Sequence, residues 1–545
     1  MPFPLPITRL PTLIRNWLKP NLDQFVENRQ PVLWLLALCV GIGAALLAIL
    51  FREAIGVFQY LWIGFNGEFL YTVAKSMPAW QVFLGPVVGG LVVGLLLERI
   101  STRRTGGVAD VIEARAITGR KLSKRDGLWS ALITTISLGS GASGGREGPV
   151  VHLGATLAMA LSERFSLPEW SRRTLLGAGV ASAISASFNA PIAGVLFAHE
   201  VILGHYSMRA LVPIVISSTA GAILSRLWFG DYAAFAVPDM QITSYWEFPA
   251  FVLLGITAAV VAMLFQFALF SADYVARKIT MPLRFRPLTG GILVGLIGVA
   301  FPQVLGVGYD ITNQALQNDM ALGLMLTLIF AKTAATAITL AARFGGGVFS
   351  PALYLGALTG ASFSIIAASA FPDMASSHGL YAMLGMGAVA GAVLGAPIST
   401  AMIVFELTGG YAISIALLLT VAVAQGVTQA LHGHSWFQWQ LEMRGLFVTD
   451  GPHRTVTATI RVMDFMETPN PDAEPEAPDP DDKRPLLSPT DTLEKALRLF
   501  DEGGWSRLPV AHPQDKDRIL TWATQIRALA YFNRALVQAS EEEHR

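Results

Sequence analysis

The sequence predicts an all-α protein that crosses a membrane many times, with a small α/β tail in the cytoplasm. Three observations support this prediction: the low and uneven charge, long stretches without charged residues, and a pattern that occurs in both halves of the chain. Only 14% of the 545 residues are charged and 53% are hydrophobic, whereas about a quarter of the residues of a soluble domain are charged. A fully soluble globular fold is therefore excluded.

Charge divides the chain into a membrane body and a tail. Residues 1–450 contain 27 basic and 22 acidic residues, whereas residues 451–545 contain 12 basic and 17 acidic residues. No part of the chain has the basic excess that nucleic-acid binding requires. The single cysteine, Cys39, leaves no intramolecular disulfide. We predict four regions: a cytoplasmic N-terminal segment (1–30), a membrane domain (31–449), a partly disordered linker (450–487) and a cytoplasmic unit (488–545).

The membrane domain is predicted from stretches that lack Asp, Glu, Lys and Arg. These are residues 30–51, 76–97, 127–145, 174–199, 248–272, 287–309, 344–372, 374–405 and 407–441. Several reach the roughly 20 residues that cross a bilayer as a helix, and others are broken by Gly and Pro. Broken helices persist in a membrane where their backbone is buried in protein or lines a wet cavity, which is typical of a channel or transporter. Basic residues near the N-terminus and at Lys121–Arg125 predict a cytoplasmic face and a plasma (inner) membrane location.

The two halves of the membrane domain share a pattern. Pro191 and Pro397 each follow an alanine and precede a glutamate by nine residues, at Glu200 and Glu406. A glycine-rich break that ends in proline lies some 40–50 residues before each. Repeats with paired broken helices indicate a substrate site near the membrane midplane, where the repeats meet.

The two glycine-rich breaks predict helix starts. In Gly148-Pro149 and Ser350-Pro351, a capping residue precedes a proline. The first N–H groups of a helix lack internal partners and its dipole is positive there, so two such ends would attract an anion. The alternative is that the glycines simply allow tight helix packing.

Glu147 favours the anion site, because a lone carboxylate inside a membrane is a functional candidate. It would act as a tethered competitor for the anion and swing away when protonated. Alternatively, Arg146 forms a structural ion pair with it. A membrane hydrolase lacks a serine motif to join His152, and a cation-coupled carrier would use Glu147, Glu200 and Glu406. The helix starts favour anions over cations. No metal or cofactor is predicted.

At these residues the sequence resembles the CLC family of chloride channels and proton/chloride antiporters. Gly145-Arg146-Glu147-Gly148-Pro149 matches the family's G-R/K-E-G-P motif, and Gly345–Pro351 contains its G-x-F-x-P element. The resemblance implies a homodimer with one pore per subunit, built from two inverted halves of tilted and partial helices. It also implies that Glu147 is the gating and proton-accepting glutamate and that the amides of Val348 and Phe349 bind the anion. The remaining anion-site positions are Gly106, Gly107, Arg146, Gly148 and Phe437.

The chain departs from the family pattern at three functional positions. The anion-binding serine of the family is replaced by Gly106, and the pore tyrosine by Phe437. Two hydroxyl donors are thereby lost, so we expect weak discrimination among chloride, bromide and nitrate. The inner proton glutamate of the antiporters falls on Val201, beside Glu200. We therefore predict a voltage- or pH-gated anion channel, with a proton-coupled chloride antiporter as the alternative.

The tail resembles a single cystathionine-β-synthase (CBS) motif. Its predicted elements are a helix in Ser488–Phe500, strands at Arg507–Val510 and Ile519–Trp522, and a helix in Gln525–Leu536. The resemblance would imply adenine-nucleotide binding, although no specific residue supports it.

Overall fold

We describe the protein from a computed structural model. It describes residues 29–117, 119–231, 242–372, 375–408, 413–446, 459–468, 484–512 and 518–544, with residues 18–20, 22, 23, 25, 26, 235, 456 and 457. Most of the predicted N-terminal segment (1–30) and positions 469–483 of the predicted linker lie outside the described residues.

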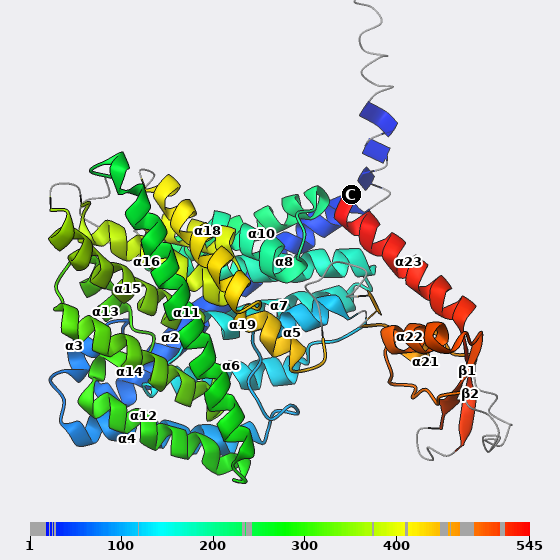
Figure 1. Cartoon of the computed structure of the whole chain (residues 1–545), viewed down its shortest axis with the longest axis horizontal. Coiled ribbons are helices and arrows are strands. Elements are labelled where there is room, and N and C mark those ends of the chain that lie inside the picture. The colour runs from blue at the N-terminus through cyan, green and yellow to red at the C-terminus, as the bar shows by residue number, and fades with distance from the viewer. Residues whose placement is uncertain are drawn as a thin grey trace, which may run out of the picture.

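The first half of the membrane domain consists of helices of unequal length (Figure 1). They are α2 (Gln30–Ile63), α3 (Leu70–Ala74), α4 (Ala79–Leu97), α5 (Val108–Ala116), α6 (Lys124–Gly139), α7 (Glu147–Arg164), α8 (Glu169–Phe188), α9 (Pro191–Phe197), the π-helix η2 (Ala198–Leu203) and α10 (Met208–Phe229).

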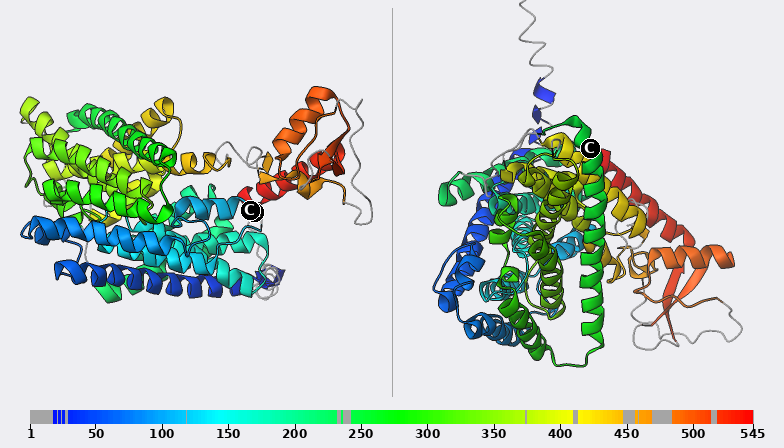
Figure 2. Two further views of the ribbon diagram at one scale, coloured as in Figure 1. Left: turned by 90° about the horizontal axis from the view of Figure 1, so that it is seen from below. Right: turned by 60° about the vertical axis from the view of Figure 1, so that its left-hand side comes forward.

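The second half repeats this order. It comprises η3 (Tyr245–Glu247), α11 (Phe248–Lys278), η4 (Leu283–Phe285), α12 (Arg286–Ala300), η5 (Pro302–Val304), α13 (Tyr309–Leu316), α14 (Leu322–Ala341), α15 (Phe349–Ala370), α16 (His378–Leu394), α17 (Pro397–Thr408) and α18 (Ser414–Leu431). The helix α19 (Trp436–Glu442) follows without a counterpart among the described elements of the first half. The left view of Figure 2 shows the first half, blue to cyan, as one layer and the second half, green to yellow, as another.

Helix length explains why the domain is not a bundle of simple spans. Eight of the described helices are long and apolar enough to cross a membrane. At 1.5 Å per residue, the 34 residues of α2 extend about 51 Å, well beyond the roughly 30 Å hydrocarbon layer, so this helix must tilt. The helix α9 continues directly into η2, and together their 13 residues (Pro191–Leu203) extend about 20 Å, too short to cross that layer. Tilted and partial helices are thus confirmed.

The short helices are stabilised by reciprocal contacts between the halves. The carboxylate of Glu200 accepts hydrogen bonds from the N–H groups of Ile398 (3.1 Å) and Ser399 (2.7 Å) at the start of α17. In return, the carboxylate of Glu406 on α17 accepts from Ile192 (3.0 Å) and Ala193 (2.7 Å) at the start of α9. The paired Pro-to-Glu spacing in the sequence therefore reflects two helix starts, each capped by a carboxylate from the other half.

The tail forms a small α/β unit with its own core. It contains α21 (Val462–Phe465), α22 (Leu493–Gly503), α23 (Gln525–His544) and the antiparallel strands β1 (Arg507–Ala511) and β2 (Ile519–Thr524). The predicted strands and helices are present. The unit begins earlier than the predicted boundary at residue 488, because Val462 and Phe465 are fully buried against α22 and the sheet. Part of the predicted linker is therefore folded.

Candidate functional site

The starts of α7 and α15 are joined through their glycine-rich breaks. The N–H of Gly145 donates to the carbonyl of Gly347, and the N–H of Gly347 donates to that of Gly145, each at 2.7 Å. Each helix begins two residues later, at Glu147 and Phe349. The two helix starts are thus held side by side, with their unpaired N–H groups close together.

Close approach explains the glycines on both sides of this bridge. A Cβ atom on Gly345 would lie 2.3 Å from Oγ1 of Thr134, so α6 leaves no room for a side chain there. Gly346 and Gly347 instead line the cavity described below, and a Cβ on Gly347 would lie 3.3 Å from the N atom of Gly148. Packing therefore explains the glycine at position 345, whereas the backbone of Gly346 and Gly347 borders the cavity.

Glu147 lies between the two helix starts. Its side chain is almost fully buried, and Oε1 accepts a hydrogen bond from the hydroxyl of Ser350, the second residue of α15. The other oxygen, Oε2, is buried without a hydrogen-bond partner in the described part of the chain. A carboxylate that begins one helix therefore occupies the positive end of the other.

Arg146 points away from Glu147. Its guanidinium pairs with Glu68 and lies 3.4 Å from the hydroxyl of Tyr309, and Arg52 pairs with the same Glu68 at 3.0 Å. Among the described residues, no ion pair joins Arg146 to Glu147. The structural ion pair considered from the sequence is therefore wrong, although a buried ion pair involving Arg146 does exist.

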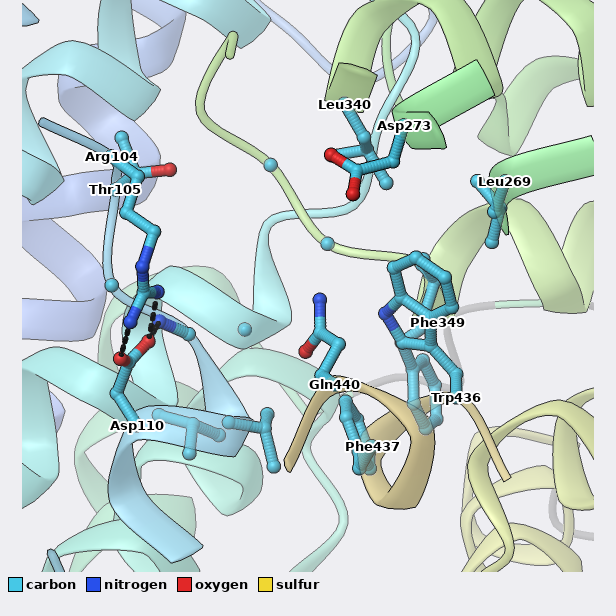
Figure 3. A pocket seen from close by; sticks show the side chains of 18 of the residues that line it. Arg104, Thr105, Asp110, Leu269, Asp273, Leu340, Phe349, Trp436, Phe437 and Gln440 are labelled. Carbon is cyan, nitrogen blue, oxygen red and sulfur yellow. Dashed lines mark hydrogen bonds and ion pairs between the residues drawn. The ribbon is translucent and has the colours of Figure 1, made fainter. Parts of the chain in front are cut away.

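A cavity of about 350 Å³ lies against the joined helix starts. Of the predicted site residues it is lined by Gly106, Gly107, Glu147, Gly148, Val348, Phe349 and Phe437. In Figure 3, Phe437 and Gln440 rise from α19 into this space, with Phe349 and Trp436 on one side and Arg104 and Asp110 on the other. Arg146, Glu200 and Val201 are not among the lining residues. The structure thus brings together seven of the predicted positions from four separate parts of the chain.

His152 explains why position 106 has no side chain. A Cβ atom on Gly106 would lie 2.4 Å from Nε2 of His152, which is buried on α7. The N–H of Gly106 donates to the hydroxyl of Ser130 at 2.7 Å. His152 and Ser130 were not predicted to belong to this region, because neither lies near the glycine in the sequence.

Phe437 is placed by a helix cap and by aromatic packing. The Ser435 hydroxyl accepts from the N–H of Gln438, and the Gln438 side chain accepts from the N–H of Ser435 at 2.8 Å, which fixes the start of α19. Trp436 stacks on Trp439 with ring centroids 5.2 Å apart. Phe437 therefore presents a ring edge without a hydroxyl to the cavity.

Four arginines and two aspartates surround one end of the cavity. Arg104 and Arg444 both contact Asp110, at 2.5 and 3.1 Å. Arg277 and Arg343 contact Asp273, at 2.7 and 3.6 Å. Arg444 also contacts Glu113 at 2.8 Å, and Arg120 pairs with that glutamate at 2.9 Å. With these two residues included, each group carries one net positive charge, which favours anions. The sequence analysis missed both groups, since their members lie up to 334 positions apart.

The pKa of Asp110 reflects this setting. The aspartate lies on the short helix α5, which is not among the eight helices long enough to cross a membrane. Burial would raise the pKa of its carboxyl, but the hydrogen bond and charge of Arg104, with the charge of Arg444, lower it to about 2. Asp110 therefore remains ionised at physiological pH.

The predicted inner proton position contains no available carboxylate. Val201 is half-buried within η2, a π-helix, where a regular α-helix was expected. The carboxylate of Glu200 is bound to the start of α17, as described above. His199 is buried, and its Nε2 has no hydrogen-bond partner in the described residues.

Comparisons with known proteins agree with this geometry. Residues 89–429 match the protein family described as "Voltage gated chloride channel". The chain is 31% identical over 385 residues to a ClcB-like chloride channel protein of Ralstonia nicotianae, covering 70% of this chain and 90% of that one. Its fold resembles a slow cyanobacterial Cl⁻/H⁺ antiporter (TM-score 0.68, 21% identity, 76% of this chain and 97% of that one). It also resembles a eukaryotic CLC transporter (TM-score 0.66, 18% identity, 92% and 98%).

Proposed function

Because the chain belongs to the voltage-gated chloride channel family, known as CLC, we propose that it conducts chloride and other small anions through one pore per subunit. The observation that carries the proposal is the joining of the α7 and α15 starts beside a cavity. Unpaired N–H groups and two positive helix ends stabilise an anion without a buried cation. Such a site binds weakly enough for the anion to leave again, as conduction requires.

We propose that Glu147 gates this pore. With its carboxylate bound to Ser350 at the start of α15, the side chain occupies the place that an anion would take. Protonation removes the negative charge, weakens this attachment and lets the side chain move aside. Acidification and a change in voltage that drives anions toward the site would both open the pore.

The two arginine–aspartate groups would serve the inner mouth of the same pore. Each places two guanidinium groups around an aspartate and carries a net positive charge, so the local field attracts anions. The anion would pass from these groups, along Gly106 and Phe437, to the helix starts.

We propose that conduction is not coupled to protons. A coupled antiporter needs a titratable group that connects Glu147 to the inner side, and Val201 cannot carry a proton. Releasing Glu200 would expose the N–H groups of Ile398 and Ser399, which is costly within a membrane. Should coupling nevertheless be observed, the buried His199 would be the first residue to substitute, because its free Nε2 lies two positions before Val201.

A second copy of the chain would cover the surface formed by α9 and α17. The short helices α9 and α17 expose Ile192 (54%) and Ile398 (47%), whose N–H groups are bonded to half-buried carboxylates. These carboxylates would be unstable if this surface faced lipid. We therefore propose that the surface is the homodimer interface. We also propose that the dimer lies in the plasma membrane with both termini in the cytoplasm. Ile192→Cys in a Cys39→Ser background should yield a cross-linked dimer with a short bis-maleimide. Exclusively monomeric protein would contradict the dimer proposal.

The transport proposal is tested by chloride efflux from proteoliposomes loaded with KCl. Addition of a potassium ionophore should start rapid chloride release, and the rate should rise as external pH falls. Vesicles containing Glu147→Ala protein should release chloride at all pH values tested. Retention of chloride by both proteins, with potassium movement instead, would contradict anion conduction.

A further inference from the structure

Gln440 shares the cavity-facing side of α19 with Phe437. The two residues are three positions apart, which places them on the same face of a helix, and both line the cavity. The expected hydroxyl donor is absent at Phe437, and one helical turn later a residue with an N–H donor appears. The donor is therefore displaced along the pore rather than lost.

The side-chain carboxamide of Gln440 is not used to stabilise the described part of the fold. No hydrogen bond joins its side chain to a described residue, whereas the carboxamide of the neighbouring Gln438 is bonded to the N–H of Ser435. Figure 3 shows the Gln440 amide extended into the middle of the cavity, between Asp110 and Phe349. A polar group oriented in this way is available to a ligand.

Two donors close to this part of the cavity are already engaged. The Arg104 guanidinium is bonded to Asp110, and the N–H of Gly106 is bonded to Ser130. Position 106 has no hydroxyl, and His152 fills the space that a side chain would need. Apart from the arginines and the backbone amides, the lining side chains that carry a donor are all neutral: Gln440, Thr105, Trp436 and Trp439.

We infer that Gln440 is a specificity-determining residue whose carboxamide N–H₂ group hydrogen-bonds the permeating anion between the arginine groups and the helix starts. This inference rests on the proposed anion conduction and names a ligand group for it. The amide is neutral at every physiological pH, so its contribution does not vary with pH. Its NH₂ group carries two N–H donors, one of which can point at the anion.

The test measures chloride affinity by isothermal titration calorimetry on the purified full chain, together with chloride and nitrate efflux from proteoliposomes. Gln440→Leu removes both donors and keeps a side chain of similar volume. Because a hydrogen bond to a charged partner contributes about 1.5–3 kcal/mol, chloride affinity should fall by about 10- to 150-fold. Gln440→Asn retains the amide and should lose less. Gln440→Glu has the same shape but repels anions and should lose more.

Gln317→Leu is the matched control, because this glutamine is exposed at the end of α13 and outside the cavity. Its affinity and efflux should equal those of the wild type. Chloride affinity of Gln440→Leu within twofold of the wild type would overturn the inference while leaving anion conduction intact. Absence of anion efflux in the wild type itself would instead overturn the proposed function. Thermal unfolding of each variant shows whether a lower affinity reflects misfolding. If Gln440→Leu is misfolded, the chloride affinities of Gln440→Asn and Gln440→Glu test the inference instead.

Discussion

Removal of the Ser350 hydroxyl should open the pore at neutral pH. This hydroxyl donates to Oε1 of Glu147, and the other carboxylate oxygen is buried without a hydrogen-bond partner in the described residues. A hydrogen bond to a charged group contributes about 1.5–3 kcal/mol, which is about 10- to 150-fold in the equilibrium between bound and released carboxylate. Ser350→Ala should therefore increase chloride efflux at pH 7.5 by about tenfold or more.

A double-mutant cycle separates this effect from a direct effect on the anion. Efflux would be measured for Ser350→Ala, Glu147→Ala and the double variant at pH 7.5 under a potassium ionophore. If Ser350 acts by holding Glu147, its substitution should change nothing once the carboxylate is absent. Ser362→Ala on the same helix is the control, because that buried hydroxyl has no hydrogen-bond partner in the described residues. An equal change in both backgrounds would refute the reasoning, since Ser350 would then act on the anion itself.

Three further perturbations test other parts of the site. Glu147→Gln removes the charge that competes with anions, so efflux should lose most of its pH dependence; a wild-type pH profile would move the gate elsewhere. Phe437→Tyr combined with Gly106→Ser restores two hydroxyl donors and should raise the preference for chloride over nitrate. Because a Cβ atom on Gly106 would lie 2.4 Å from Nε2 of His152, Gly106→Ser alone should lower the unfolding temperature. Asp110→Asn removes the carboxylate partner of Arg104, while Arg444 keeps its contact with Glu113. The substitution should destabilise the fold by about 1–3 kcal/mol at pH 7. The pKa of Asp110 in the folded protein is lowered to about 2. The difference in unfolding free energy between the wild type and Asp110→Asn should therefore persist down to about pH 4 and shrink below it. A difference that stays constant down to pH 2 would contradict the lowered pKa of Asp110.

Much of the fold was predictable because its signals are local. Charge-free stretches mark buried or lipid-facing helices, and the pairs Gly148-Pro149 and Ser350-Pro351 located the starts of α7 and α15 to within two residues. Gly148 and Ser350 are the second residues of these helices and not their caps, which are Arg146 and Val348. The repeated spacing from Pro191 to Glu200 and from Pro397 to Glu406 predicted two related halves. Its physical meaning, a carboxylate from each half capping a helix of the other, required the structure.

The remaining parts of the site depend on contacts between distant residues. Arg146 is adjacent to Glu147 in sequence, yet it pairs with Glu68, because the helix start directs the two side chains apart. His152 behind Gly106 and the two arginine groups around Asp110 and Asp273 leave no local pattern. Gln440 could have been found from the sequence, since a polar residue follows Phe437 at helical spacing in an aromatic segment.

The claim of uncoupled anion conduction is tested most directly by proton movement under a chloride gradient. Proteoliposomes with high internal chloride would be placed in weakly buffered, low-chloride medium, with the voltage clamped at zero by potassium and valinomycin. We predict chloride efflux without proton uptake, because Val201 cannot relay a proton and Glu200 is bonded to the start of α17. Uphill proton uptake in fixed proportion to chloride efflux, abolished by Glu147→Gln, would contradict the account and establish an antiporter.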